Sequence, residues 1–410
     1  KPMCYHVNNQ CLEISSSPRL LAHRFKKNIS KSYVRLGLVT GVFDGEAGLT
    51  AYEEIFEFPA GHCLVGSITK SVDISSAIPW YKIEDTVDQR ISDSTSNSDL
   101  HDLFVDAVSL RLVADVPVAV SQSGGIDSSI ISGIARQNIS NLTAFTFGSG
   151  SDSELPNAEI HCKLNDIKLI PVEPASNAQG RFDELLHTFD AQEAPFLGFS
   201  IVAQNLVFKR AKEEGIKVLL GGQGADEVFG GYRKYLAPAI FSKSSDLDYK
   251  SRIMSIQTIL GEVGLSKRYS LNDVLSRALG TSRHKSIGIF NDSTIENLKP
   301  KGFSFDDHRI FDIRTGSLPT LLRYEDRNSM YHSIETRLPF LDWRIVEAGM
   351  RMTEKNLFTS GYPKYALRKA FSQYMPDSIT WERNKRGFDT SSIYQSKDIA
   401  LLQLEYILDN

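Results

Sequence analysis

The sequence predicts an α/β protein in which a domain built on a parallel sheet follows a smaller, β-rich part. Two observations predict the sheet. Apolar runs of strand length alternate with stretches of helical periodicity after residue 100, and a glycine-rich loop joins one such run to a helix pattern. A third observation, a series of short apolar runs bounded by turn residues before residue 75, predicts the β-rich part.

The β-rich part is expected to occupy residues 1–75. Its strand-like runs include Tyr33–Val39 and His62–Gly66, each of which combines apolar side chains with glycine. Residues 76–99 are more polar and rich in Ser and Asp, which is typical of a linker. We therefore place the domain boundary in this segment.

The main domain is expected to cover residues 100–410. A helix pattern begins at Leu100, and the apolar run Val116–Val120 leads into the glycine-rich loop. Helical patterns separate the later runs, which predicts βαβ units with ligands bound at the carboxyl ends of the strands. From about residue 235 the pattern is mostly helical. The later strand-like runs are Thr143–Phe147, Lys168–Val172 and Lys217–Leu220.

Composition excludes several classes of protein. A chain of 410 residues exceeds the usual size of one domain, which agrees with a two-domain reading. The net charge of −4 provides no basic surface for nucleic acid, and no apolar stretch approaches the ~18 residues that span a membrane. The 4 cysteines form no C-x-x-C pair, which indicates reduced thiols rather than a disulfide framework or a zinc site. We therefore expect a cytoplasmic protein.

The loop Ser123–Ser129 reads S-G-G-I-D-S-S and carries the clearest chemical signal. Adjacent glycines let a backbone turn tightly and direct N–H groups at an anion, and the following helix adds its positive end. As three letters S-G-G is usually an ordinary turn, but its place between strand and helix patterns predicts a nucleotide phosphate. Asp127 would repel that phosphate unless Mg²⁺ stood between them. The chain lacks a G-x-x-x-x-G-K-[ST] sequence, so we expect ATP to be cut between its α and β phosphates.

This loop is similar to the S-G-G-x-D-S loop of the ATP-pyrophosphatase family, which holds pyrophosphate while a carboxylate or carbonyl is adenylated. Leu219–Tyr232 narrows the resemblance, because it is similar to the G-E-G-A/S-D-E-x-F-G-G-Y segment of asparagine synthetases. Ser333–Asp342 resembles their E-x-R-x-P-F-L-D segment. The fourth match is Lys364–Arg368, followed by Arg383–Phe388, so four motifs occur in the family's order.

The resemblance implies an adenine nucleotide alpha hydrolase-like synthetase domain over residues 100–410. It also reaches upstream, where four segments look like the late part of the family's glutaminase domain, which is an N-terminal nucleophile amidotransferase. We therefore expect the chain as given to lack the cysteine nucleophile and not to use glutamine, with Cys4 a structural thiol. It is then a fragment of a longer amidotransferase, or it works with free ammonia or a partner glutaminase. The four segments are Lys1–His6, Leu12–Ser16, Leu49–Ile55 and Phe58–His62.

The reaction implied by the resemblance converts L-aspartate, ATP and ammonia into L-asparagine, AMP and diphosphate through a β-aspartyl-adenylate. Its substrates are small molecules, its cofactors are ATP and Mg²⁺, and the resemblance allows a homodimer. Two alternatives stay open, because a fold does not fix the substrate. One is amidation of another carboxylic acid, such as a sugar acid, a peptide or a secondary metabolite. The other is a non-catalytic ATP-binding partner.

Four residues receive chemical roles from the resemblance. Asp127 and Asp226 match the Mg²⁺-binding aspartates, although Asp226 could instead cap a helix. Glu335 is the expected base that takes protons from ammonia, and a surface pair with Arg337 is the alternative that spacing alone favours. Lys364 would counter the negative charge on the reacting phosphate and the tetrahedral intermediate.

The nucleotide contacts implied by the resemblance extend along both loops and one strand. Gln122 replaces a residue that is often apolar in the family, and Gln223 replaces a common glutamate. Arg368 and Lys385 are weaker candidates for the anionic region. The expected ATP contacts are Gln122, Ser123, Gly124, Gly125, Asp127, Ser128, Ser129, Phe147, Gly221 and Gly222.

Overall fold

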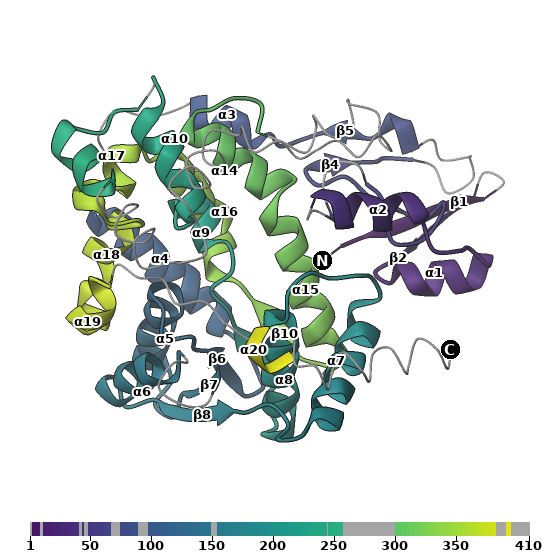
Figure 1. The fold of residues 1–410 in the computed structure, drawn as a ribbon, viewed down its shortest axis with the longest axis horizontal. Helices are drawn as coiled ribbons and strands as arrows, with labels where there is room; N and C mark the ends of the chain where they lie inside the picture. The colour runs from purple at the N-terminus through teal and green to yellow at the C-terminus, as the bar shows by residue number, and fades with distance from the viewer. Residues whose placement is uncertain are drawn as a thin grey trace.

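The structure of the chain is a computed structural model. Its elements form two groups, and Figure 1 shows the N-terminal group in purple beside the larger group that contains the long helix α15 (Ser317–Tyr331). The described residues are 2–8, 11–40, 43–44, 48–66, 74–88, 97–148, 154–243, 245–256, 300–382 and 391–394.

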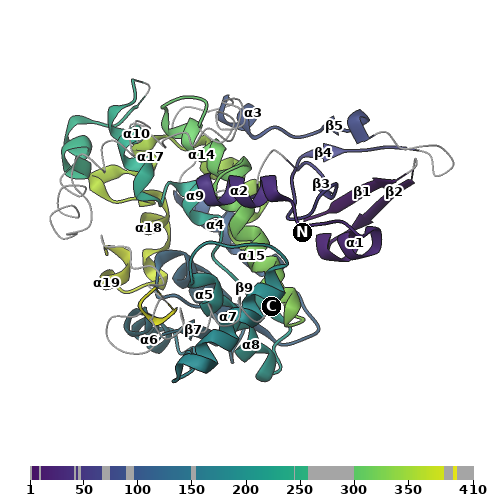
Figure 2. The ribbon, with the colours of Figure 1, turned by 45° about the vertical axis from the view of Figure 1, so that its right-hand side comes forward.

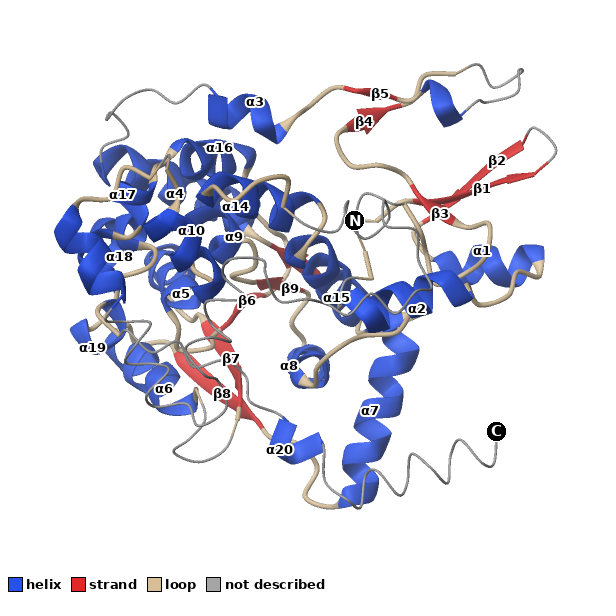
Figure 3. Ribbon diagram, turned by 45° about the horizontal axis from the view of Figure 1, so that its top comes forward, coloured by secondary structure: helices blue, strands red, loops and turns tan. Residues whose placement is uncertain are grey.

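A five-stranded sheet with the order β10-β9-β6-β7-β8 organises the larger group, and every neighbouring pair in it is parallel. Figure 3 labels four of these strands, β6, β7, β8 and β9, in red among the helices. Four of the strands lie where the sequence predicts them, which confirms the α/β fold with a parallel sheet. The strands are β6 (Val118–Ser121), β7 (Thr143–Phe147), β8 (Lys168–Val172), β9 (Val218–Leu220) and β10 (Glu335–Arg337).

The fifth strand, β10, was not expected, because the pattern after residue 235 is mostly helical. It has three residues, two of them charged, and it pairs with β9 at the edge of the sheet. An edge strand this short has no run of alternating apolar residues that could predict it. Pairing with β9, rather than the sequence of β10 itself, sets its conformation. Glu335 is its first residue and lies opposite Val218.

Helices cover both faces of the sheet, as in a doubly wound fold. On one face Val120 and Ala144 pack with α4 (Asn97–Leu112) and α5 (Ile126–Asn138). On the other face Ala119 and Phe145 pack with α8 (Ser200–Glu213). Successive strand residues therefore face opposite layers, and the helix predicted from Leu100 is confirmed with its start at Asn97.

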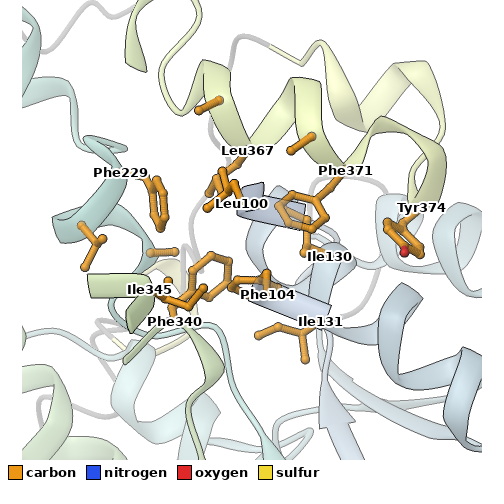
Figure 4. Close-up of a cluster of buried hydrophobic side chains, with 14 of the residues drawn as sticks. Leu100, Phe104, Ile130, Ile131, Phe229, Phe340, Ile345, Leu367, Phe371 and Tyr374 are labelled. Carbon is orange, nitrogen blue, oxygen red and sulfur yellow. The ribbon is translucent and has the colours of Figure 1, made fainter. Parts of the chain in front are cut away.

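An aromatic core joins the C-terminal helices to α4, as Figure 4 shows. The Phe104 ring lies 4.5 Å from the Phe340 ring and 5.3 Å from the Phe371 ring, measured between centroids. All three side chains are fully buried, and burial of each contributes about 2 kcal/mol. This packing fixes α18 (Tyr365–Phe371) over the first βα unit, so that Lys364, just before α18, reaches the carboxyl edge of the sheet.

The N-terminal group contains β1 (Cys4–Asn8), β2 (Cys11–Ser15) and β3 (Phe56–Glu57), which form an antiparallel sheet with β1 at its centre. The strand expected at Tyr33–Val39 is wrong, because Lys31–Thr40 forms the helix α2. Tyr33 and Leu36 are buried three residues apart, which is helical spacing, and a Cβ on Gly37 would overlap the Phe43 ring. Within the run His62–Gly66 only β4 (His62–Cys63) is a strand, and it pairs with β5 (Ile78–Pro79).

Polar contacts, one of them a buried ion pair, attach the N-terminal group to α15 (Ser317–Tyr331) and to the end of α7 (Ala178–Gln192), and Figure 2 shows α15 between the two groups. Arg323 Nε donates to Asp44 Oδ2 at 2.9 Å, and both side chains are less than a tenth exposed. Arg327 donates to the Ser16 carbonyl at 2.6 Å, and Ser17 donates to Glu193. The same helix therefore contacts the N-terminal group and, through other side chains, the site described below.

Shorter helices complete the larger group and the segment expected to be a linker. In that segment Glu84 of α3 (Ile83–Asp88) pairs with Arg314 of α14 (Phe305–Arg314). Within the described residues, no helix has the length and apolar character needed to cross a membrane. The remaining helices are α1 (Pro18–Phe25), α3 (Ile83–Asp88), α6 (Leu155–Leu164), α7 (Ala178–Gln192), α9 (Ala225–Phe229), α10 (Leu236–Phe241), α14 (Phe305–Arg314), α16 (Trp343–Arg351), α17 (Glu354–Leu357), α19 (Asp377–Thr380) and α20 (Ser391–Tyr394).

Candidate active site

A cavity of about 530 Å³ lies at the carboxyl ends of β6 and β9, where the topology predicts a ligand site. Its walls come from the loops after these two strands, from α8 and α15, and from the segment that begins α18. Elements far apart in the sequence therefore meet at one sheet edge. A second cavity, of about 370 Å³, lies in the N-terminal group and has mostly apolar walls.

The loop Ser123–Ser128 forms an open cradle for an anion. Gly124 has a φ of 72°, and a Cβ there would come within 2.7 Å of the Ala158 nitrogen, so the turn requires glycine. The Gly124 N–H donates to Gln122 Oε1 at 3.1 Å, and the Ser123 N–H donates to Ser128 Oγ at 3.2 Å. Because α5 begins here, its positive end faces the cavity, which suits a phosphate.

Lys364 lies between the two predicted metal-binding aspartates. Its Nζ is 2.7 Å from Asp127 Oδ2 and 2.6 Å from Asp226 Oδ1, and its side chain is 6% exposed. Burial by itself lowers the pKa of Lys364, but the carboxylates of Asp127 and Asp226 outweigh it and raise the pKa above its ordinary value. The lysine is therefore a firmly charged cation beside the phosphate cradle.

Glycines permit this close approach. A Cβ on Gly231 would lie 1.9 Å from Asp226 Oδ1 and 2.1 Å from Lys364 Cε, so a side chain there would displace the ion pair. A Cβ on Gly222 would lie 3.1 Å from the Asp127 Cβ, which brings the two loops together. The alternative role for Asp226 as a helix cap is wrong, because Gly224 caps α9 and Asp226 lies in its first turn.

Glu227 of α9 stabilises the loop that follows β9. Its carboxylate is buried and accepts hydrogen bonds from the Tyr232 and Ser317 hydroxyls, each at 2.8 Å. Burial, with a further contribution from neighbouring Asp226, raises the pKa of Glu227. This buried network anchors the start of α9, which carries Asp226.

The donor set suits Mg²⁺ held jointly with a nucleotide. Among the described residues, no group of three or more His, Cys, Asp or Glu side chains forms a complete protein cage for a metal. Two carboxylates face the cradle, and Mg²⁺ is commonly held by one or two carboxylates together with substrate phosphates. Asp127 and Asp226 therefore fit a shared metal only when phosphate oxygens complete its shell.

Most of the predicted site residues lie together, and three of the expected ATP contacts do not line the cavity. Ser129 is fully buried inside α5, and Phe147 packs in the core beneath the sheet. Gln122 is buried and acts on the cradle through its bonds to Gly124 and Ser132. The predicted residues that line the cavity are Ser123, Gly124, Gly125, Asp127, Ser128, Gly221, Gly222, Asp226 and Lys364.

Glu335 does not join them. Its side chain is 61% exposed at the edge of the sheet, and its Oε1 accepts from Arg337 Nε at 2.8 Å. It begins β10, whereas the cavity lies beyond the carboxyl end of the neighbouring strand. This is the surface pair with Arg337 that spacing alone favoured, and a catalytic role for Glu335 does not fit the geometry.

A different glutamate, Glu325 of α15, lines the cavity and was missed. It is 4% exposed, and its Oε2 accepts from Gln204 Nε2 at 2.5 Å and from Gln223 Nε2 at 3.4 Å. Burial raises the pKa of Glu325 to about 7, against the opposing effect of the two amides. Its helix face is shared with Asn328 and Ser329, so no apolar stripe in the sequence marks it as buried.

Of the two weaker candidates for the anionic region, Arg368 has a structural role and Lys385 is not among the described residues. Arg368 lines the cavity, but its guanidinium donates to the carbonyls of Pro363, Thr380 and Glu382, so it braces the C-terminal segment. Cys4 is buried in β1, and burial raises its thiol pKa to about 12, which suits a structural thiol.

Comparisons with known proteins identify relatives of this chain by sequence. The glutamine-hydrolysing asparagine synthetase 1 of Bacillus subtilis is 26% identical over 318 residues, which cover 71% of this chain and 49% of the relative. Amidase chyE of Penicillium rubens is 24% identical over 337 residues, with coverages of 67% and 50%. Asparagine synthetase B of Escherichia coli is 22% identical over 374 residues, with coverages of 85% and 54%. The chain thus spans about half the length of these relatives.

Among solved structures, the NH3-dependent NAD synthetase of Campylobacter jejuni is 15% identical, and the match covers 49% of this chain and 91% of that protein. The TM-score is 0.25, which is too low to carry an argument. The family assignment rests instead on the sequence. The profile described as asparagine synthase matches residues 99–406, well over half of the chain, and the chain therefore belongs to the asparagine synthase family.

Proposed function

We propose that this chain activates a carboxylic acid with ATP, releasing diphosphate, and then converts the acyl-adenylate into an amide with release of AMP. The observation that carries the proposal is the position of Lys364 between Asp127 and Asp226 beside the glycine cradle. A cation, two carboxylates and the positive N-terminal end of α5 at one sheet edge suit the phosphates of ATP and the charge that grows on them.

The first step joins an acid oxygen to the α-phosphorus of ATP and breaks the bond to the β-phosphate. Lys364 and the N-terminal end of α5 would hold the departing diphosphate and spread its charge. Mg²⁺, held by Asp127 and Asp226 with phosphate oxygens, would supply further neutralisation. In the second step a nitrogen lone pair attacks the acyl carbon, AMP leaves with the C–O electron pair, and the nitrogen loses a proton.

L-Aspartate is the acid that we propose first, since several similar proteins are named asparagine synthetases. A larger or less polar acid is the second candidate. One wall of the cavity is apolar, with Ile201, Val207, Phe208 and Leu321, and two similar fungal proteins are named amidases.

We also propose a cytoplasmic location, because the four cysteines are free thiols, which suits a reducing compartment.

The test incubates the protein with ATP, MgCl₂, ammonium chloride and L-aspartate, and then with a panel of aliphatic and aromatic acids. We expect AMP and diphosphate to form only when an acid is present. Production of ADP and phosphate instead would contradict the proposal, because it would place the cut at the γ-phosphate. Absence of diphosphate with every acid would favour the non-catalytic ATP-binding partner.

A further inference from the structure

Glu325 is the acidic side chain on the wall formed by α8 and α15. Gln204 and Gln223 reach its Oε2 from two different elements, so the carboxylate is held from both sides by neutral donors. Its Oε1 lies near Gly221, where a Cβ would come within 2.9 Å of it. The glycine at 221 therefore keeps the second carboxylate oxygen close to the loop that follows β9.

That loop also adjoins the cradle, because Gly222 packs against Asp127. The wall that carries Glu325 and the phosphate-binding edge thus border the same cavity through two consecutive glycines. A nucleophile held at Glu325 would be presented to an acyl group activated at the cradle. The positive charge of Lys364 lies beside Asp127 and Asp226, where it suits the phosphates.

We propose that the Glu325 carboxylate binds the attacking nitrogen, as ammonia or a primary amine, and takes its proton as the amide forms. The inference rests on the proposed acyl-adenylate chemistry. A buried carboxylate repels the acid and the phosphates but attracts N–H groups, so it selects the nitrogen substrate. The two glutamine amides hold the carboxylate in place without neutralising it.

The step balances without any further reactant. The nitrogen lone pair forms the C–N bond, the C–O bond to AMP breaks, and AMP keeps the electron pair. The N–H proton passes to Glu325, which then releases it to water. Among the described residues, burial raises the pKa of Glu325 and the amides of Gln223 and Gln204 lower it, so the carboxyl can take up and release a proton near neutral pH.

Position 223 offers an internal check on this assignment. Asparagine synthetase motifs commonly carry glutamate there, whereas this chain has Gln223, whose amide contacts Glu325. One hydrogen bond joins positions 223 and 325 in this chain. Exchanging the two residues, Gln223→Glu with Glu325→Gln, would keep the charge, the volume and the contact while moving the acid back.

The first test needs no acyl substrate. Carbon-13 NMR of glutamate-labelled protein follows the Glu325 carboxyl during a pH titration, with Glu325→Gln identifying the signal. We expect ammonium chloride and methylammonium chloride to lower its apparent pKa by about one unit relative to sodium chloride. Tetramethylammonium, which has no N–H to donate, should not do so. Equal titrations in all four salts would overturn the proposal.

The second test separates nitrogen binding from acid activation. With an acid that supports turnover, Glu325→Gln should retain acid-dependent diphosphate release but lose amide formation by roughly 100-fold. The matched control Glu335→Gln should retain both, and the residue exchange should restore much of the amide. Parallel reactions with ammonium and methylamine distinguish the two nitrogen sources.

Each outcome of these tests decides between the two proposals. Wild-type amide rates in Glu325→Gln, or equal loss of diphosphate release and amide, would overturn the role of Glu325. If wild-type protein releases no diphosphate with any acid, the proposed function fails, and the titration still decides whether Glu325 binds N–H cations.

Discussion

Lys364 Nζ lies 2.7 Å from Asp127 Oδ2, although 237 positions separate the two residues in the sequence. The contact joins the C-terminal helices to the first loop of the parallel sheet. Lys364 also has a φ of 56°, a left-handed conformation that costs a side-chain-bearing residue about 1 kcal/mol. Such strain persists where surrounding packing fixes the backbone, and here the aromatic core under α18 does so.

Replacing Lys364 by Met should expose the charge balance of this site. The change leaves Asp127 and Asp226 facing each other without their cation, and breaking a buried pair costs about 3 kcal/mol. We expect a lower melting temperature that MgCl₂ partly restores, with a larger gain than in wild type. Differential scanning fluorimetry against NaCl of equal ionic strength measures this, and an equal response in both salts would contradict the account.

Replacing Gly231 by Ala should disrupt the same ion pair by steric means. The new Cβ would lie within about 2 Å of both Asp226 and Lys364, and overpacking of this kind costs about 2 kcal/mol. We expect loss of ATP-dependent turnover at temperatures where the variant is still folded. Gly215→Ala is the control, because φ there is 77° but nothing lies within 4 Å. It should lose stability and keep its turnover, and similar turnover in the two variants would argue against the ion pair.

Glu325 should leave a signature in the pH dependence of stability. Burial raises its pKa from 4.5 in the unfolded chain to about 7, so the folded state holds the proton more tightly. The stability it contributes is fully present below pH 4.5 and is lost as the pH rises through 7. Relative to Glu325→Gln, the wild-type free energy of unfolding should fall by about 3 kcal/mol between pH 4.5 and pH 8. Urea unfolding at both pH values measures it, and parallel curves would refute the buried carboxylate.

The Asp44–Arg323 pair should couple the N-terminal group to α15. Arg323→Met leaves the Asp44 carboxylate buried without its main partner and should cost about 3 kcal/mol. Adding Asp44→Asn removes that stranded charge, so the double variant should be more stable than the sum of the single losses allows. A double-mutant cycle in urea tests this, and strictly additive losses would show that the pair is not coupled.

The sheet and the cradle were predictable because their signals are local. Strand-length apolar runs located β7 and β8 correctly. The glycines and serines of the loop Ser123–Ser128 predicted its turn. The helix α2 was mistaken for a strand because Tyr33–Val39 contains a single polar residue, Arg35, so its many apolar residues hide the helical spacing of the buried Tyr33 and Leu36.

Glu335 and Glu325 show why the rest was not predictable. The motif at Glu335 is local and recognisable, yet its side chain points to solvent because β10 forms the sheet edge only through pairing with β9. Glu325 is buried by contacts with Gln204 and Gln223, which lie 121 and 102 positions away. Burial produced by contacts so distant in the sequence leaves no pattern in the neighbouring residues.

Oxygen transfer tests the central claim most directly. The protein is incubated with ATP, MgCl₂, ammonium chloride and an acid that carries oxygen-18 in its carboxylate. L-Aspartate is used first, and then the acid that supports turnover. The AMP is analysed by mass spectrometry. The account predicts one labelled oxygen in AMP, because the acid oxygen that attacks the α-phosphorus leaves with it. The Lys364→Met variant should form far less labelled AMP. Unlabelled AMP produced at the rate of amide formation would contradict the acyl-adenylate.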